Sequence, residues 1–191
     1  MEITTQMVKE LRERTGAGIM DAKRALQETD GDMSKAAAVI EQQGLARADK
    51  KAGRTASQGF VWSYIHGAQP GQNGGRIGAL VEINCETDFV AKTEDFRNLC
   101  RDIAMQVAAS DPQFISAEEI PGHVMDQGAE RAGGQKKFVE QAALLSQPFI
   151  KDPSKTVEDL IKERIGKLGE NIVVRRFARF ELGAAAEIAE E

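Results

Sequence analysis

Residues 77–85 read IGALVEINC, a run in which apolar side chains occupy every second position. This period of two is typical of a β-strand that lays one face on a hydrophobic core. Residues 60–66, FVWSYIH, are also rich in strand-forming side chains. Residues 67–75 between them are rich in glycine and also contain proline and asparagine. We therefore expect two antiparallel strands joined by a connection longer than a usual hairpin loop.

A helix is predicted shortly after the second strand. Thr93 precedes two acidic residues, a pattern typical of a helix start because oxygen acceptors and negative charge satisfy the free N–H groups there. Apolar residues then recur at helical spacing, namely Phe96, Leu99, Cys100, Ile103 and Val107. We expect this apolar stripe to lie across the sheet.

The rest of the chain predicts further helices and a third strand. Residues 122–134 are polar and contain glycines, so a loop is expected there, before a helical pattern at 136–145. A capping-box pattern at residues 156–159 opens another helix, which Gly169 should end. Residues 172–182 are predicted to be the last strand. This order of elements indicates the α+β class.

The N-terminal residues predict a separate unit of three short helices. The first helix should begin after Thr4-Thr5 and end in the turn at residues 15–18. The second is expected over residues 19–28, and the third is expected to begin at a Ser34 cap and end at Gly44. A bundle of this size is close to the lower limit for independent folding, so binding is favoured over chemistry as its role.

The pattern divides the chain into four parts. These are a three-helix domain at 1–45, a basic linker or exposed helix at 46–58, an α+β core domain at 59–183 and an acidic tail at 184–191. We interpret the basic stretch as a solvated connector, with an arm that contacts phosphate groups as the alternative.

Composition excludes several classes of protein. The 191 residues are 41% hydrophobic and 29% charged, as in globular proteins, and the net charge of −5 argues against general affinity for nucleic acid or anionic membranes. No apolar run approaches the roughly 18 residues that a membrane span requires, and the first residues do not resemble a signal peptide, so we expect a cytoplasmic location. Cys85 and Cys100 are expected to be reduced and buried.

No motif for a nucleotide, metal or catalytic site is found in the sequence. Gly16-Ala17-Gly18 lies between two predicted helices and follows no strand, so neither phosphate-binding fingerprint is satisfied. His66 and His123 lack neighbours at metal-ligand spacing. Glu86 and Asp88 could form a carboxylate pair, but no nucleophile or oxyanion motif accompanies them. We expect a protein that is not an enzyme and has no cofactor or metal.

The segment between the second strand and its helix contains an aromatic residue, Phe89, on a predicted turn beside Asp88 and Thr87. Two interpretations are open. Phe89 folds back into the core, which the local sequence favours, or it projects as a wedge into a partner's pocket, as interface hot spots do.

Three stretches of the sequence, residues 8–26, 84–91 and 169–177, together resemble the elongation factor Ts family, in the family's order and across nearly the whole chain. The resemblance implies a guanine nucleotide exchange factor for the GTPase elongation factor Tu in translation elongation. It further implies that the N-terminal unit resembles a ubiquitin-associated three-helix bundle and that the core domain is of the dimerisation type.

The resemblance also implies the site residues. In the family, a Thr-Asp-Phe-Val segment inserts into the GTPase and displaces its Mg²⁺ site, which here carries over to Thr87, Asp88, Phe89 and Val90, with Phe89 as the wedge. The factor itself would not bind the nucleotide. The residues implied to dock the bundle on the GTPase are Leu11, Arg12, Thr15, Gly16, Ala17, Gly18 and Met20. Leu11 and Met20 could equally belong to the core of the bundle.

One departure from long members of the family is the short, glycine-containing segment between Pro121 and Phe138, where those members carry a second subdomain and a coiled-coil insertion. The second subdomain is expected to be reduced, as in the family's short forms. We hypothesise that two copies pair through their sheets, so that each supplies what the other lacks.

Two other functions remain as alternatives. A ubiquitin-like-binding adaptor would use the bundle but leaves the stretches at 84–91 and 169–177 without a role. An RNA-binding module would rest on the basic residues of 47–54 with Arg175, Arg176 and Arg179, but strand alternation sends these arginines to both faces of the sheet.

Overall fold

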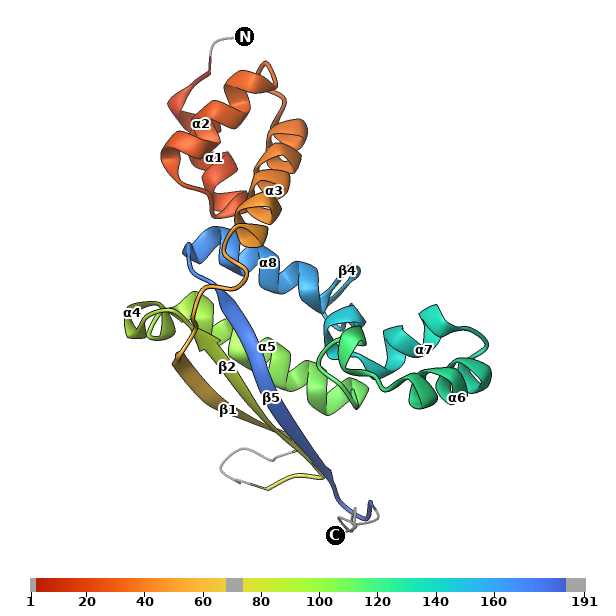
Figure 1. The fold of residues 1–191 in the computed structure, drawn as a ribbon. Helices are drawn as coiled ribbons and strands as arrows, with labels where there is room; N and C mark the ends of the chain where they lie inside the picture. The colour runs from red at the N-terminus through yellow and green to blue at the C-terminus, as the bar shows by residue number, and fades with distance from the viewer. Residues whose placement is uncertain (1–2, 68–73, 185–191) are drawn as a thin grey trace.

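The computed structural model describes residues 3–67 and 74–184. Three helices form a bundle at one end of the molecule, and the long third helix leads into a core domain built on a three-stranded sheet (Figure 1). One helix lies across the sheet, another lies between the sheet region and the bundle, and a helical pair projects to one side (Figure 1). The predicted α+β class, with an N-terminal helical unit before a small antiparallel sheet, is confirmed.

The bundle contains α1 (Thr5–Thr15), α2 (Ile19–Glu28) and α3 (Met33–Asp49). The Thr4 side chain accepts a hydrogen bond from the N–H of Met7, and Gly16 ends α1 with a left-handed backbone, as predicted. The buried core of the bundle is small and aliphatic, and consists of Val8, Leu11, Ala22, Ala25, Leu26 and Ala36.

The predicted bounds of α3 are wrong at both ends. The helix is capped by Asp32, whose carboxylate accepts from the N–H groups of Ser34 and Lys35, and it continues through Gly44 to Asp49. Gly44 does not end the helix. The close packing here depends on Gly166 of α8 (Val157–Leu168), because a Cβ added to Gly166 would lie 2.9 Å from the Gly44 Cα. The bundle therefore contacts the core domain through a close approach of two helices. The proposed division at residue 45 falls within α3 and stays a prediction.

The sheet has the strand order β1 (Gln58–His66), β2 (Ile77–Cys85) and β5 (Ile172–Glu181), and both pairings are antiparallel. Ile83 of β2 lies opposite Phe60 of β1, and Cys85 of β2 lies opposite Ile172 of β5. The predicted strands are confirmed to within two residues. Most of the predicted loop at 67–75 lies outside the described residues.

α5 (Glu94–Ser110) covers one face of the sheet and supplies more of the buried core residues than any other element. Thr93 caps it as predicted, and its side chain accepts from the N–H of Phe96. The whole predicted stripe is buried, with Phe96 and Ile103 fully enclosed. Burying a side chain of this size contributes roughly 1.5–3 kcal/mol, so this stripe fixes the helix on the sheet.

The region after α5 differs from the prediction. Residues 122–134 form α6 (Gly122–Ala132) where a loop was expected, and α7 (Gln135–Ala142) follows. Gly128 is buried in α6, and a Cβ there would lie 2.3 Å from the Phe138 ring of α7. The missing side chain therefore permits the two helices to pack. The 3₁₀ turns are Ala117–Glu119 and Leu144–Ser146, and β3 (Pro148–Phe149) pairs with β4 (Asp152–Thr156).

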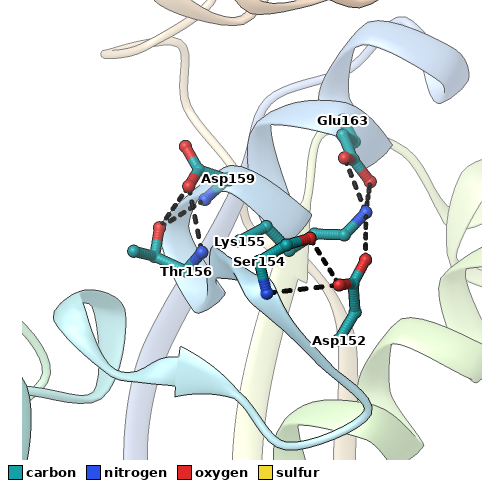
Figure 2. Close-up of polar contacts among 6 residues, drawn as sticks. All are labelled: Asp152, Ser154, Lys155, Thr156, Asp159 and Glu163. Atoms are coloured by element: carbon teal, nitrogen blue, oxygen red, sulfur yellow. Dashed lines mark hydrogen bonds and ion pairs between the residues drawn. The ribbon is translucent and has the colours of Figure 1, made fainter.

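α8 (Val157–Leu168) begins in the polar cluster of Figure 2. The Thr156 hydroxyl accepts from the N–H of Asp159 at 3.1 Å, and the Asp159 carboxylate accepts from the N–H of Thr156 at 3.0 Å. This reciprocal pair is the predicted capping box. Lys155 extends the cluster by pairing with Glu163, 2.8 Å away, one turn further along the helix. α8 ends at Gly169, also as predicted.

We expect Thr156→Ala to lower the free energy of unfolding by about 1 kcal/mol, because the N–H of Asp159 in the first turn loses its acceptor. The hydrogen bond from the Thr156 N–H holds the pKa of Asp159 below its usual 3.8, so its stabilising contribution is present above that value and is lost as pH falls through the lowered pKa. Urea unfolding at neutral and acidic pH measures both effects, with Glu158→Gln as the control. Equal stability of Asp159→Asn and the parent at neutral pH would contradict this assignment.

Both cysteines are buried and unpaired by a disulfide, which confirms their predicted burial. Burial raises the pKa of the Cys85 thiol to about 11 and that of Cys100 to about 12. Because the thiolate is the reactive form, neither should react with a thiol reagent at about pH 7.5 while the chain is folded, and both should react in denaturant. Counting the thiols that react with Ellman's reagent before and after denaturation checks this prediction. Rapid reaction of the native protein would contradict it.

Candidate functional site

The segment that joins β2 to α5 places Phe89 on the surface. Thr87 caps the short helix α4 (Asp88–Ala91) by accepting from the N–H of Val90 at 3.4 Å. Ala91 is buried and Val90 packs against the core, so the segment is anchored from below. Phe89 is 80% exposed, so the interpretation that its side chain folds back into the core is wrong. Because the cap already orders the backbone of this turn, binding through Phe89 needs little further ordering of the main chain.

Asp88 is exposed beside Phe89 and pairs with Lys92 one turn later, at 2.6 Å. The hydrogen bond from Lys92 lowers the pKa of this carboxyl, so Asp88 carries its charge at neutral pH and below. The segment therefore presents an apolar ring and a negative charge side by side.

The second candidate surface is the turn between α1 and α2. Met20 is 72% exposed and Arg12 is exposed. Leu11 is completely buried in the bundle core, so direct contact of Leu11 with a partner requires the bundle to repack. For Leu11 the structure thus favours the core interpretation, and for Met20 the surface one.

The backbone of this turn is held by local hydrogen bonds. The Thr15 hydroxyl donates to the Leu11 carbonyl at 2.7 Å and accepts from the N–H of Ala17 at 3.3 Å. Gly18 lies next in the chain, just before α2, and is exposed. Together with Gly16, these turn residues line a cleft of about 600 Å³ between the bundle and α8.

One lysine connects the two candidate surfaces. Lys167 of α8 lies against Gly16, where a Cβ would approach its Cε to 2.8 Å, and its ammonium group pairs with Asp95 at 2.7 Å. Asp95 is in the first turn of α5, directly after α4. The turn of the bundle and the Phe89 segment are therefore linked through α8, although 68 residues, 19–86, separate them in the chain.

The sequence analysis missed Ile19, which is 59% exposed beside Met20. Helical spacing places Ile19 on the same side as Ala22 and Leu26, so periodicity predicts burial. The usable signal was its position directly after the glycine-containing turn, at the first residue of α2.

Other kinds of site find little support in the described part of the chain. Among residues 3–67 and 74–184, no group of three or more His, Cys, Asp or Glu residues is placed to hold a metal ion. Within the same ranges, no helix is both long and apolar enough to cross a bilayer. The basic residues considered for RNA binding are largely occupied by acidic partners, in the pairs Arg47–Asp21, Arg54–Glu86, Arg176–Glu82 and Arg179–Asp111.

The fold and these surfaces define a class of protein: a helical bundle joined to an α+β core, with apolar side chains displayed on two anchored turns. The family description "Elongation factor TS" matches residues 2–134 and 131–184. The chain belongs to the elongation factor Ts family.

Its relatives have closely similar lengths. Elongation factor Ts of Carboxydothermus hydrogenoformans is 53% identical over 208 aligned residues, which cover 99% of this chain and 93% of that protein. Elongation factor Ts of Caldanaerobacter subterraneus is 52% identical, with 97% and 99% covered, and that of Syntrophomonas wolfei is 52% identical, with 97% and 92% covered. Membership in this family implies a nucleotide exchange factor for elongation factor Tu in translation elongation.

Proposed function

We propose that this chain releases GDP from elongation factor Tu by inserting the segment Thr87–Val90 beside the bound Mg²⁺. The observation that carries the proposal is Phe89, a large apolar side chain held 80% exposed on a capped turn. A buried aromatic side chain typically anchors a protein interface, and this one is displayed where a partner's pocket can receive it.

The mechanism follows from how a GTPase holds its nucleotide. Mg²⁺ bridges phosphate oxygens and side chains of the GTPase, so moving its ligands weakens the grip on GDP. Phe89 separates packed elements of the partner, and the negative charge of Asp88 competes for polar contacts near the metal. The exchange factor makes or breaks no covalent bond and needs no contact with the nucleotide.

Thermodynamic linkage sets the direction of the effect. A protein that binds nucleotide-free elongation factor Tu more tightly than the GDP-bound form weakens GDP binding by the same factor. GTP, when it binds, displaces the exchange factor by the same reciprocity.

The bundle supplies the affinity in this proposal. Met20 and Arg12 would contact the GTPase around the turn at residues 15–18, with Ile19 added to the surface by its exposure. Because α8 links this turn to the Phe89 segment through Lys167, docking of the bundle positions the wedge.

The test is the release of fluorescent GDP from purified elongation factor Tu of the same organism, chased with excess unlabelled GDP. We expect the release rate to rise with the concentration of this protein and to reach a plateau. A rate that does not change at any concentration would refute the proposed function and would favour the adaptor alternative.

We also propose that two copies pair through the open face of the sheet, opposite α5. Exposed apolar residues from all three strands gather on this face, namely Val61, Ile65, Leu80, Val173 and Phe180. Leu80 lies at the centre because β2 is the middle strand. Apolar patches of this kind commonly mark contact sites.

Leu80→Glu should convert the dimer into a monomer, because it places a charge at the centre of the apolar contact. Sedimentation velocity at micromolar concentration measures the change, and Gln127→Glu on the exposed surface of α6 is the matched control. A parent protein that sediments as a monomer and still exchanges GDP fully would refute the pairing.

A further inference from the structure

The strand pairing brings together two stretches that are distant in the sequence. Cys85, the last residue of β2, pairs with Ile172, the first residue of β5. The residues that leave β2 therefore lie beside those that connect α8 to β5. One of these connecting residues, Glu170, is without a role in the function described above.

The Glu170 carboxylate is bound to the base of the Phe89 segment by three hydrogen bonds. Its Oε2 accepts from the N–H of Glu86 at 3.1 Å and from the N–H of Thr87 at 2.9 Å. Its Oε1 accepts from the Thr87 hydroxyl at 2.5 Å. A carboxylate suits this place because it offers acceptor sites on both oxygens and has no donor to clash with the three groups that point at it.

The Thr87 hydroxyl passes this constraint on to α4. Because it donates its hydrogen to Glu170, its lone pairs are turned toward the N–H of Val90, from which it accepts at 3.4 Å. The cap of α4 is thus oriented by a side chain 83 residues away. Hydrogen bonds linked in this way strengthen one another.

A second, reciprocal set of contacts fixes Glu170 itself. The Glu86 side chain accepts from the N–H of Asn171 at 2.7 Å, and the buried Asn171 side chain donates to the carbonyl of Arg54 at 2.8 Å. Each of the two connections therefore holds the other through a side chain. The position of Glu170 is set by the ordered backbone around it.

We propose that Glu170 is a positioning residue for nucleotide exchange, which holds the segment Thr87–Val90 in the conformation that inserts into the GTPase. This inference rests on the proposed function. We call the three hydrogen bonds from Glu86 and Thr87 to the Glu170 carboxylate the clasp. Without the clasp, the segment samples other conformations. The apparent strength of insertion then falls in proportion to the fraction of time that the segment spends in the conformation able to insert. A fraction of about one tenth lowers the plateau rate of GDP release by about tenfold.

The first test measures the clasp in the free protein. In Glu170→Ala, the N–H groups of Glu86 and Thr87 lose their acceptor, so their hydrogen exchange, followed residue by residue by NMR, should accelerate by about tenfold or more. The N–H groups in the middle of β2 should keep their protection. Unchanged protection of Glu86 and Thr87 would overturn the clasp, and this result does not depend on elongation factor Tu.

The second test separates positioning from general stability. With fluorescent GDP bound to elongation factor Tu, Glu170→Ala should lower the plateau rate about tenfold and leave the half-saturating concentration within about twofold, because the bundle surface is untouched. Glu170→Gln, which keeps one acceptor oxygen, should recover part of the rate. Glu130→Ala, on the exposed face of α6, is the matched control.

Two outcomes would overturn the positioning role while leaving the proposed function intact. One is an unchanged plateau rate in Glu170→Ala despite lost amide protection. The other is a loss as large in the Phe89→Ala background as in the parent when Glu170→Ala is added, since most of what Glu170 positions is then already removed. If the parent protein itself does not release GDP, the proposed function fails and the amide measurement still decides the clasp.

Discussion

Phe89→Ala is expected to remove most of the acceleration of GDP release, by about 30-fold or more at the plateau. Truncating an aromatic anchor at the centre of an interface typically costs 2 kcal/mol or more, which corresponds to about a factor of 30. The thermal stability of the free protein should not fall, because the side chain is 80% exposed and packs little against the rest of the chain. Stopped-flow release of fluorescent GDP and thermal unfolding measure the two effects.

The controls for this variant separate insertion from docking. Phe89→Leu keeps an apolar side chain of smaller volume and should retain part of the activity. Binding of Phe89→Ala to nucleotide-free elongation factor Tu should weaken without disappearing, because the bundle surface remains. A variant that releases GDP at the parent's rate would show that Phe89 is not the wedge.

Leu11→Ala should have the largest effect on stability. Replacing a fully buried leucine by alanine costs about 2–5 kcal/mol, through lost burial and the cavity that remains. A bundle of this size rarely has more than about 3–5 kcal/mol of stability, so the variant should leave α1–α3 largely unfolded while the sheet and α5 keep their structure. Hydrogen exchange followed by NMR, compared between the bundle and β2, measures this.

Met20→Ala is the matched control, because both residues belong to the same implied docking surface. Because the Met20 side chain is 72% exposed, the Met20→Ala variant should have a free energy of unfolding within about 0.5 kcal/mol of the parent's. It should raise the half-saturating concentration in the exchange assay. Equal losses of stability in the two variants would contradict the assignment of Leu11 to the core and Met20 to the surface.

The regular elements were predictable because their signals are local. β2 alternates without interruption, and Thr93 stands directly before the stripe of α5, so both were predicted correctly. The errors fall where glycine serves tertiary packing. Gly44 and Gly128 were interpreted as breaks in helices, but each lies inside one. At Gly128 the Phe138 ring comes too close for a side chain, and at Gly44 the backbone is approached closely by Gly166 of α8. Sequence spacing carries no information on which helix approaches.

The candidate site was predictable only through resemblance. The local pattern around Phe89 favoured a core position, because an apolar ring beside a strand end is usually buried. Its exposure follows from α4, a single turn capped by Thr87 that points the ring outward while Val90 and Ala91 face the core. Glu170 could not be associated with this segment from the sequence, since only the pairing of β2 with β5 brings the two connections together.

The most direct test of the central claim compares the acceleration of GDP release with and without Mg²⁺. Fluorescent GDP release from elongation factor Tu is followed at saturating concentrations of this protein, in Mg²⁺ buffer and after chelation of the metal. If the segment Thr87–Val90 acts by displacing the Mg²⁺ site, chelation performs part of its work in advance, and the fold acceleration should shrink. An acceleration of the same size in both buffers would contradict the mechanism.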